Sequence, residues 1–182
     1  MTELSVPIYY SAGNHELSLQ EKQPEAWKKY LQSIHEKVTY LENTGTFLTH
    51  HPDIFISGLS LPRVFYKKGR LQKNAELLPN LSVPENVVHI MLAHHPEYAP
   101  LYDVYQADLI VSGHLHGGLL RLPRIGGIIS PRLRLPAYDA GVFSLSGGKK
   151  MFVSRGLGSH TIPLRFFNRV EVNFLVLQGT KK

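Results

Sequence analysis

The chain of 182 residues contains no cysteine. Disulfide bonds and thiolate-ligated zinc are therefore excluded, and any bound metal must be held by His, Asn, Asp or Glu. Such nitrogen and oxygen donors favour Mn, Fe, Zn or Mg. Long hydrophobic runs are also missing, since none approaches the roughly 20 residues that a membrane-spanning helix needs, and no signal peptide opens the sequence. As given, the sequence predicts a soluble, cytoplasmic protein.

Acidic residues are fewer than basic ones, 14 against 20, which gives a formal net charge of +6. This balance is compatible with a polyanionic partner such as nucleic acid, a wall polymer or an anionic lipid. The basic residues are scattered, however, apart from a short cluster at 67–70, and they do not interleave with aromatic residues as in a nucleic-acid platform. We therefore expect a solvated basic face and no specific nucleic-acid partner.

A length of 182 residues with 43% hydrophobic content supports one domain with a real core. Helical spacing of apolar residues predicts a helix over 24–38, with Trp27 and Val38 facing inward, and a short crossover helix over 100–107, with Val104 and Tyr105 inward. Between and around these segments lie strand-like runs at 6–12, 54–59, 87–93, 108–112, 142–145, 151–153 and 170–177. The alternation favours a single α/β domain spanning residues 1–182.

The stretch 108–118 organises the chain. An apolar run leads directly into His114 and His116, which are separated by one residue and bracketed by glycines. Two histidines at i and i+2, where the chain leaves a sheet, can aim their nitrogens at neighbouring metal ions. The alternative is an ordinary glycine turn carrying two surface histidines.

Two further strand-like runs end in polar residues of the same kind. The run 6–12 leads to Asn14, His15 and Glu16, and the run 87–93 leads to His94. Because open α/β sheets carry their sites at the carboxyl ends of strands, we expect these side chains to converge with His114 and His116.

Other histidines do not fit this pattern. His50 and His51 precede a strand instead of following it, and His35 falls on the predicted helix, so we expect these three at the surface. His89 lies inside a strand and is expected to be packed, and alternation along the chain turns His95 away from His94. After residue 118 the arginines at 121, 124, 132 and 134 form either an anion-binding lip or a solvated loop, and His160 is a weak candidate for a substrate contact.

The ordered motifs Gly13-Asn14-His15-Glu16, His94 and Gly113-His114-Leu115-His116 resemble those of the calcineurin-like metallophosphoesterases. The tail, 153–158 followed by 163–166, is similar to a bacterial branch of membrane- or wall-associated phosphodiesterases. The resemblance implies an αββα sandwich, two divalent metal ions (Mn, Fe or Zn) and hydrolysis of a phosphate ester by metal-activated water.

Carried over by motif, the resemblance assigns Asn14, His94 and His114 to one metal and His116 to the other. His15 would donate a proton or hydrogen bond to the phosphate or the leaving oxygen. Glu16 would orient that imidazole, or would instead stabilise the first turn of a helix.

The family's Asp-x-His and Gly-Asp-x-x-Asp motifs have no counterpart before Asn14, where Glu3 is the only acid. We therefore expect an N-terminally truncated domain with doubtful activity of its own, in which any membrane association would depend on a missing upstream segment. The alternative is a noncatalytic remnant that binds at most one metal or an anionic surface.

Overall fold

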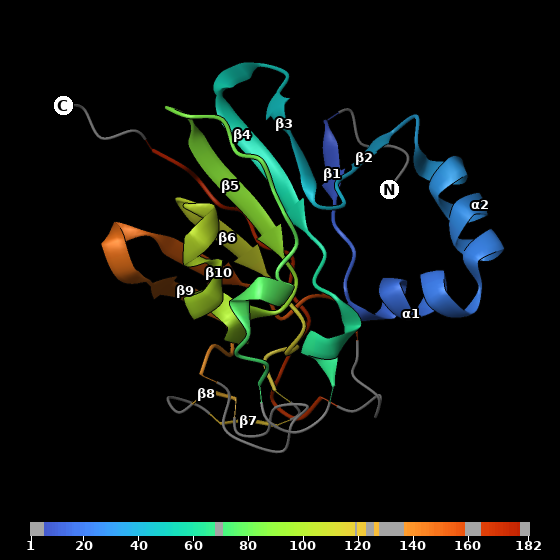
Figure 1. Ribbon diagram of the computed structural model, residues 1–182. Coiled ribbons are helices and arrows are strands. Elements are labelled where there is room, and N and C mark those ends of the chain that lie inside the picture. Colours follow the sequence, from blue (N-terminus) through green and yellow to red (C-terminus); the bar gives the residue numbers. More distant parts are fainter. Residues whose placement is uncertain are drawn as a thin grey trace.

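The computed structural model describes residues 6–67, 71–118, 120–122, 126–127, 137–158 and 165–178. Its centre is a six-stranded sheet with the order β3-β4-β5-β6-β10-β9 (Figure 1). The four inner strands run parallel to one another, and β3 and β9 are antiparallel edges. The strands are β3 Thr44–Leu48, β4 His51–Leu59, β5 Val88–Ala93, β6 Leu109–Ser112, β9 Gly141–Ser144 and β10 Lys150–Val153.

Short 3-10 helices cover one face of this sheet. They are η1 Arg63–Tyr66, η2 Ala75–Leu77 and η3 Pro96–Tyr105, and η4 Ser146–Gly148 lies between the last two strands. The main core forms where Phe65 and Tyr102 from these helices meet Met91, Ile110 and Met151 from the strands. A smaller cluster around Leu41, Ile56 and Ile90 lies on the other face. The expected α/β sheet with flanking helices is thereby confirmed.

The N-terminal part stands to one side of the sheet (Figure 1). It consists of β1 Ile8–Tyr10, α1 Asn14–Lys22, α2 Pro24–Ile34 and β2 Val38–Tyr40, and the two strands pair in parallel. The expected helix over 24–38 therefore ends early, at Ile34, and Val38 is buried as the first residue of β2. Trp27 is 5% exposed and stacks on Tyr30, which confirms it as a core residue.

Two further expectations require correction. The crossover helix is a 3-10 helix that begins at Pro96, and its three-residue period points Tyr102 and Tyr105 inward but leaves Val104 62% exposed. The run 170–177 forms no strand. Within the described residues 165–178 the only pairing is an isolated bridge between Leu120 and Phe166.

Segment 165–178 is instead fastened by side chains. Glu171 accepts hydrogen bonds from the Arg155 backbone (2.8 Å) and the Arg155 Nε (2.7 Å), and Asn173 donates to Ser154 Oγ (2.9 Å). The loop after β10 therefore holds this segment without a continuous ladder. A two-stranded ribbon, β7 Arg121–Leu122 with β8 Gly126–Gly127, completes the described elements.

The parallel inner strands place their carboxyl ends at one edge of the sheet, toward the bottom of Figure 1. At this edge β5 leads into His94, β6 into the loop 113–118, and β10 into the loop 154–158. An open sheet of this kind presents loops, and hence functional side chains, at that edge. In the described part of the chain, no helix combines the length and apolar character required to cross a membrane.

Candidate functional site

Three side chains from three strand exits meet around one oxygen. Asn14 is the first residue of α1 and follows β1, His94 follows β5, and His114 follows β6. The Asn14 Oδ1 atom lies 3.1 Å from His94 Nε2 and 3.1 Å from His114 Nδ1, within hydrogen-bond distance of both. The two imidazole rings contact edge to face, with centroids 5.1 Å apart. The structure therefore brings together residues that are 80 and 100 positions apart in the sequence.

Gly13 makes this approach possible. A Cβ atom at residue 13 would lie 2.7 Å from His94 Cδ2, closer than real carbon contacts allow. The absence of a side chain therefore lets the start of α1 pack directly against the imidazole of His94.

The loop that carries the two later histidines has an unusual backbone. His114 and His116 have positive φ angles of 65° and 50°, and they are followed by Gly117 at 73° and Gly118 at 84°. A non-glycine residue in this left-handed region costs on the order of 1–3 kcal/mol, and such residues cluster at functional sites. Leu115, 1% exposed, anchors the loop in the interior.

Asn168 holds this loop from a distant part of the chain. Its side chain is 2% exposed, and its Nδ2 donates to the carbonyl oxygens of His116 (2.6 Å) and Gly118 (2.7 Å). Sequence reasoning missed this residue, although the tail motif at 163–166 ends only two positions before it. The tail motif marked this part of the sequence, but nothing in the motif predicted the contact between Asn168 and Gly118, 50 residues earlier in the chain.

His116 has different neighbours from His114. Its Nδ1 atom lies 3.5 Å from a guanidinium nitrogen of Arg165, and that nitrogen also donates to the Arg155 carbonyl (2.9 Å). The side of its ring faces the loop after β10, near Gly158. Arg165, also missed by the sequence reasoning, therefore ties the tail segment to the second histidine of the motif.

The surroundings of His94 favour its neutral imidazole. Burial lowers the pKa of His94 to about 4; the charge of Glu16 opposes this change, and His116 and His15 reinforce it. A neutral imidazole keeps a lone pair on one ring nitrogen, which is the form that binds a metal ion.

Tyr66, at the end of η1, packs against this cluster. Its ring centroid lies 5.5 Å from that of His114 and 6.4 Å from that of His94. Burial raises the pKa of Tyr66, with a smaller contribution from Glu16, so its hydroxyl stays protonated. Among the described residues this buried hydroxyl has no hydrogen-bond partner. The sequence analysis did not single out Tyr66.

His15 and Glu16 point in different directions. His15 is exposed and lines a hollow beside Asn14, whereas Glu16 Oε2 accepts a hydrogen bond from the Gly13 backbone (3.0 Å). This contact stabilises the first turn of α1, which is the second of the two roles expected for Glu16. It also fixes the first turn of α1, and with it the position of His15.

His95 was expected to turn away from His94, but its buried ring lies against the cluster, with its centroid 4.2 Å from that of His114. The other candidates lie away from the cluster or have other partners. His35, His50 and His51 are exposed. His89 is buried and lies 2.7 Å from Ser57 Oγ, as expected for a packed residue. Arg121 pairs with Asp139 at 2.8 Å. Outside the described residues lie Arg124, Arg132, Arg134 and His160.

The chemistry of the donor set fits part of the shell of a divalent metal ion. One amide oxygen and two imidazole nitrogens converge, and all three are ligands of Mn, Fe and Zn. Among the described residues no group of three or more His, Asp or Glu side chains forms a metal site, so the amide of Asn14 is essential to this set.

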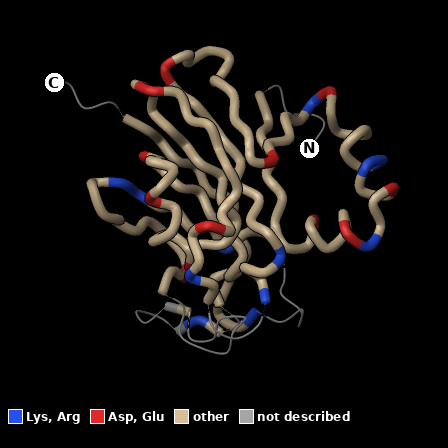
Figure 2. Tube along the Cα trace, viewed as in Figure 1, with Lys and Arg blue, Asp and Glu red and all other residues tan. Residues whose placement is uncertain are grey.

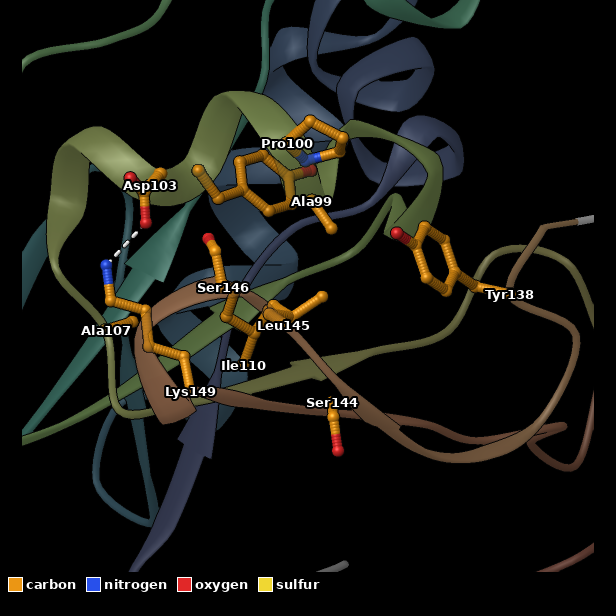
Figure 3. A pocket seen from close by; sticks show the side chains of 11 residues that line it. Ala99, Pro100, Asp103, Ala107, Ile110, Tyr138, Ser144, Leu145, Ser146 and Lys149 are labelled. Atoms are coloured by element: carbon orange, nitrogen blue, oxygen red, sulfur yellow. Dashed lines mark hydrogen bonds and ion pairs between the residues drawn. The ribbon is translucent and has the colours of Figure 1, made fainter.

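A second hollow, of about 250 Å³, lies between η3 and the β9–β10 turn (Figure 3). Apolar side chains such as Ala99, Ile110 and Leu145 line it, and an ion pair between Lys149 and Asp103 (2.5 Å) closes one side. It shares no lining residue with the histidine cluster.

Comparison with known proteins shows which family the chain resembles. The sequence profile of the calcineurin-like phosphoesterases matches residues 1–118. The chain is 35% identical over 96 residues to the uncharacterized metallophosphoesterase YkuE of Bacillus subtilis (strain 168), covering 53% of this chain and 33% of the relative. It is 35% identical over 92 residues to the phosphodiesterase YaeI of Escherichia coli (strain K12), covering 50% and 33%.

A longer alignment links the chain to the UDP-2,3-diacylglucosamine pyrophosphatase LpxG of Chlamydia muridarum (strain MoPn / Nigg), with 28% identity over 179 residues that cover 91% of this chain and half of the relative. The chain thus spans between a third and a half of the length of these three relatives. No solved structure gave a significant match.

Proposed function

Because the chain belongs to the calcineurin-like phosphoesterases, we propose that it hydrolyses a phosphate ester at the cluster of Asn14, His94 and His114. The observation that carries the proposal is the meeting of one amide oxygen and two imidazole nitrogens from three strand exits. Two relatives are named for cleaving a phosphodiester and a pyrophosphate, and both reactions are hydrolyses at phosphorus.

We assign Asn14 Oδ1, His94 Nε2 and His114 Nδ1 to one divalent ion and His116 to a second. When bound, a divalent ion supplies Lewis-acid polarisation of phosphoryl oxygens and a nucleophile from water at neutral pH. The low pKa of His94 keeps its imidazole available as a ligand at neutral pH. The amide of Asn14 adds an oxygen without a negative charge, so it does not repel a phosphate.

His15 is the proposed proton donor to the leaving oxygen. It adjoins Asn14, is exposed, and lines the hollow that opens beside the cluster. The bond from Gly13 to Glu16 holds the helix turn on which His15 stands. His15 can therefore approach a bound ester without rearrangement of the backbone.

Calorimetric titration with Mn²⁺ or Zn²⁺ tests the ligand assignment. We expect His94→Ala and His114→Ala each to weaken metal binding about 10- to 100-fold, because each removes a donor from the set. His35→Ala and His50→Ala are the matched controls, since both side chains are exposed and remote from the strand exits. Equal losses in the two pairs would show that the wrong histidines were assigned.

A rate assay on an aryl phosphodiester with Mn²⁺ tests the role of His15. We expect His15→Ala to lower turnover about 10²- to 10⁴-fold, the usual scale for a general acid, with metal affinity unchanged. A parallel fall in metal affinity would contradict the role of proton donor. Metal binding without any turnover of the unaltered chain would favour the noncatalytic alternative.

A further inference from the structure

Beside the histidine cluster, α1 and η1 form the walls of a hollow of about 280 Å³. Asn14, His15 and Ser18 line it from α1, and Arg63, Tyr66 and Lys67 line it from η1 and its end. An ion pair between Arg63 and Glu21, 2.5 Å long, fastens η1 to α1. This ion pair links the two walls at the protein surface.

The two walls differ in chemistry. The α1 wall carries the neutral Asn14 and the proposed proton donor His15, whereas the η1 wall carries the two cations Arg63 and Lys67. Figure 2 shows basic positions on this segment, beside the first turn of α1. Among the described residues, no carboxylate lines the hollow. Glu21 contacts Arg63 from outside it. The hollow therefore favours a ligand with negative charge on the η1 side.

Tyr66, part of the η1 wall, packs against the rings of His94 and His114. A buried hydroxyl without a partner costs about 1–3 kcal/mol relative to a bonded one. An acceptor oxygen that enters the hollow would remove this cost. The arrangement thus offers one neutral donor next to the cluster and two cations farther along η1.

The size of the hollow limits what can enter. A volume of 280 Å³ is several times the roughly 30 Å³ that one water molecule occupies, so a single phosphate group does not fill it. It also lies just below the roughly 300–1,000 Å³ typical of pockets that enclose a whole small molecule. A compact ligand with two anionic groups fits a space of this size.

We propose that this hollow binds a second anionic group of the substrate, so that the preferred substrates carry a phosphate or a carboxylate next to the scissile phosphate. The inference rests on the proposed function of the histidine cluster, which would hold the scissile group. Lys67 and Arg63 attract the second group, and they determine specificity without taking part in the bond cleavage.

The test is calorimetric binding to the full 182-residue chain in EDTA, with orthophosphate, pyrophosphate and phosphoglycolate as probes. We expect at least one of the two bifunctional anions to bind about tenfold more tightly than orthophosphate, the scale of one added charge-assisted hydrogen bond. The tighter of the two identifies the second group as a phosphate or a carboxylate. Equal affinity for all three probes would overturn the inference.

Two charge-neutralising variants separate a local site from a general effect of net charge. Lys67→Gln should reduce the preference for the bifunctional anion to about twofold or less and leave orthophosphate binding unchanged. Lys29→Gln removes the same charge from an exposed position on α2 and should retain the full preference. An unchanged preference in Lys67→Gln, or an equal loss in Lys29→Gln, would overturn the inference.

Tyr66→Phe tests the neutral donor, because it keeps the ring against the histidines and removes only the hydroxyl. We expect it to weaken binding of orthophosphate and of the bifunctional anion by the same factor, about three- to tenfold. Unchanged affinity for both would refute the contribution of the hydroxyl.

These measurements need no metal. A failure of the second-anion site can therefore be distinguished from a failure of the proposed function. Loss of the bifunctional preference with Mn²⁺ binding still dependent on His114 would overturn the second-anion site alone. Mn²⁺ binding that is indifferent to His114 would overturn the proposed function, and with it the assignment of the anion as part of a substrate.

Discussion

Replacing Asn168 by alanine should disturb both stability and the candidate site. In the structure its buried Nδ2 makes two short bonds, to the carbonyls of His116 and Gly118. Each hydrogen bond contributes about 1 kcal/mol, and each buried carbonyl left without a partner costs about 1–3 kcal/mol if water does not reach it. We therefore expect Asn168→Ala to lower the free energy of unfolding by about 2–4 kcal/mol.

The change should also reach the site, because these bonds hold residues with left-handed backbone. Without them His116 can relax from its φ of 50°, and the aim of its imidazole is lost. Asn168→Asp is the sharper variant, since an ionised carboxylate cannot donate to either carbonyl and would be buried beside them. We expect it to be destabilised at least as much as Asn168→Ala.

Urea denaturation followed by circular dichroism measures the stability, and titration with Mn²⁺ measures the site. Asn173→Ala is the matched control, because this exposed residue on the same segment donates a single bond to Ser154 Oγ. We expect that control to stay within about 0.5 kcal/mol of the unaltered chain. If Asn168→Ala lost no more stability than Asn173→Ala, the two bonds from Asn168 would not determine the conformation of the loop 113–118.

Other predictions concern packing and pH. Gly13→Ala should lower the free energy of unfolding by about 1–3 kcal/mol, because the new methyl group would overlap His94. Gly113→Ala should lower it less, since the new Cβ would lie 3.8 Å from the same ring. Urea denaturation of the two variants measures the difference. Burial raises the pKa of Glu171, but hydrogen bonds and the charge of Arg155 outweigh it, so the folded pKa lies below the ordinary value. The stability that this gives at pH 7 should therefore be lost as the pH falls through the folded pKa, and the difference in unfolding free energy between the unaltered chain and Glu171→Gln should shrink as the pH falls below 4.5, the ordinary value. A difference that is constant over this range would refute the pKa assignment.

The positions of the principal candidate residues could be predicted because strand exits are local features. Apolar runs ending in Asn14, His94 and His114 can be read directly from the sequence, and the parallel pairing of β5 with β6 then places His94 and His114 at one edge of the sheet. Asn14 reaches them from β1, which belongs to a separate two-stranded sheet. Their roles as metal ligands, like the assignments of His15, Glu16 and His116, remain proposals.

What could not be predicted depends on long-range or irregular structure. The alternation of apolar residues over 170–177 favoured a strand, but the structure fastens this segment through Glu171 and Asn173 side chains. The inward face of 100–107 was wrong at Val104 because a period of 3.6 was assumed where the helix has a period of three. Tyr66 and Asn168 escaped notice because each acts only through partners that are distant in sequence.

The bonds from Asn168 also affect the order in which parts of the site can form during synthesis of the chain. Synthesis proceeds from the N-terminus, so Asn14, His94 and His114 are all in place in the nascent chain while the residue that locks the loop is still unmade. The interval is 52 residues after His116 and 50 after Gly118. Until Asn168 is synthesised, its two bonds to the carbonyls of His116 and Gly118 cannot oppose relaxation of the left-handed backbone. The conformation of the loop around His116 is therefore fixed only after residue 168 has been synthesised, later than the residues of the cluster themselves.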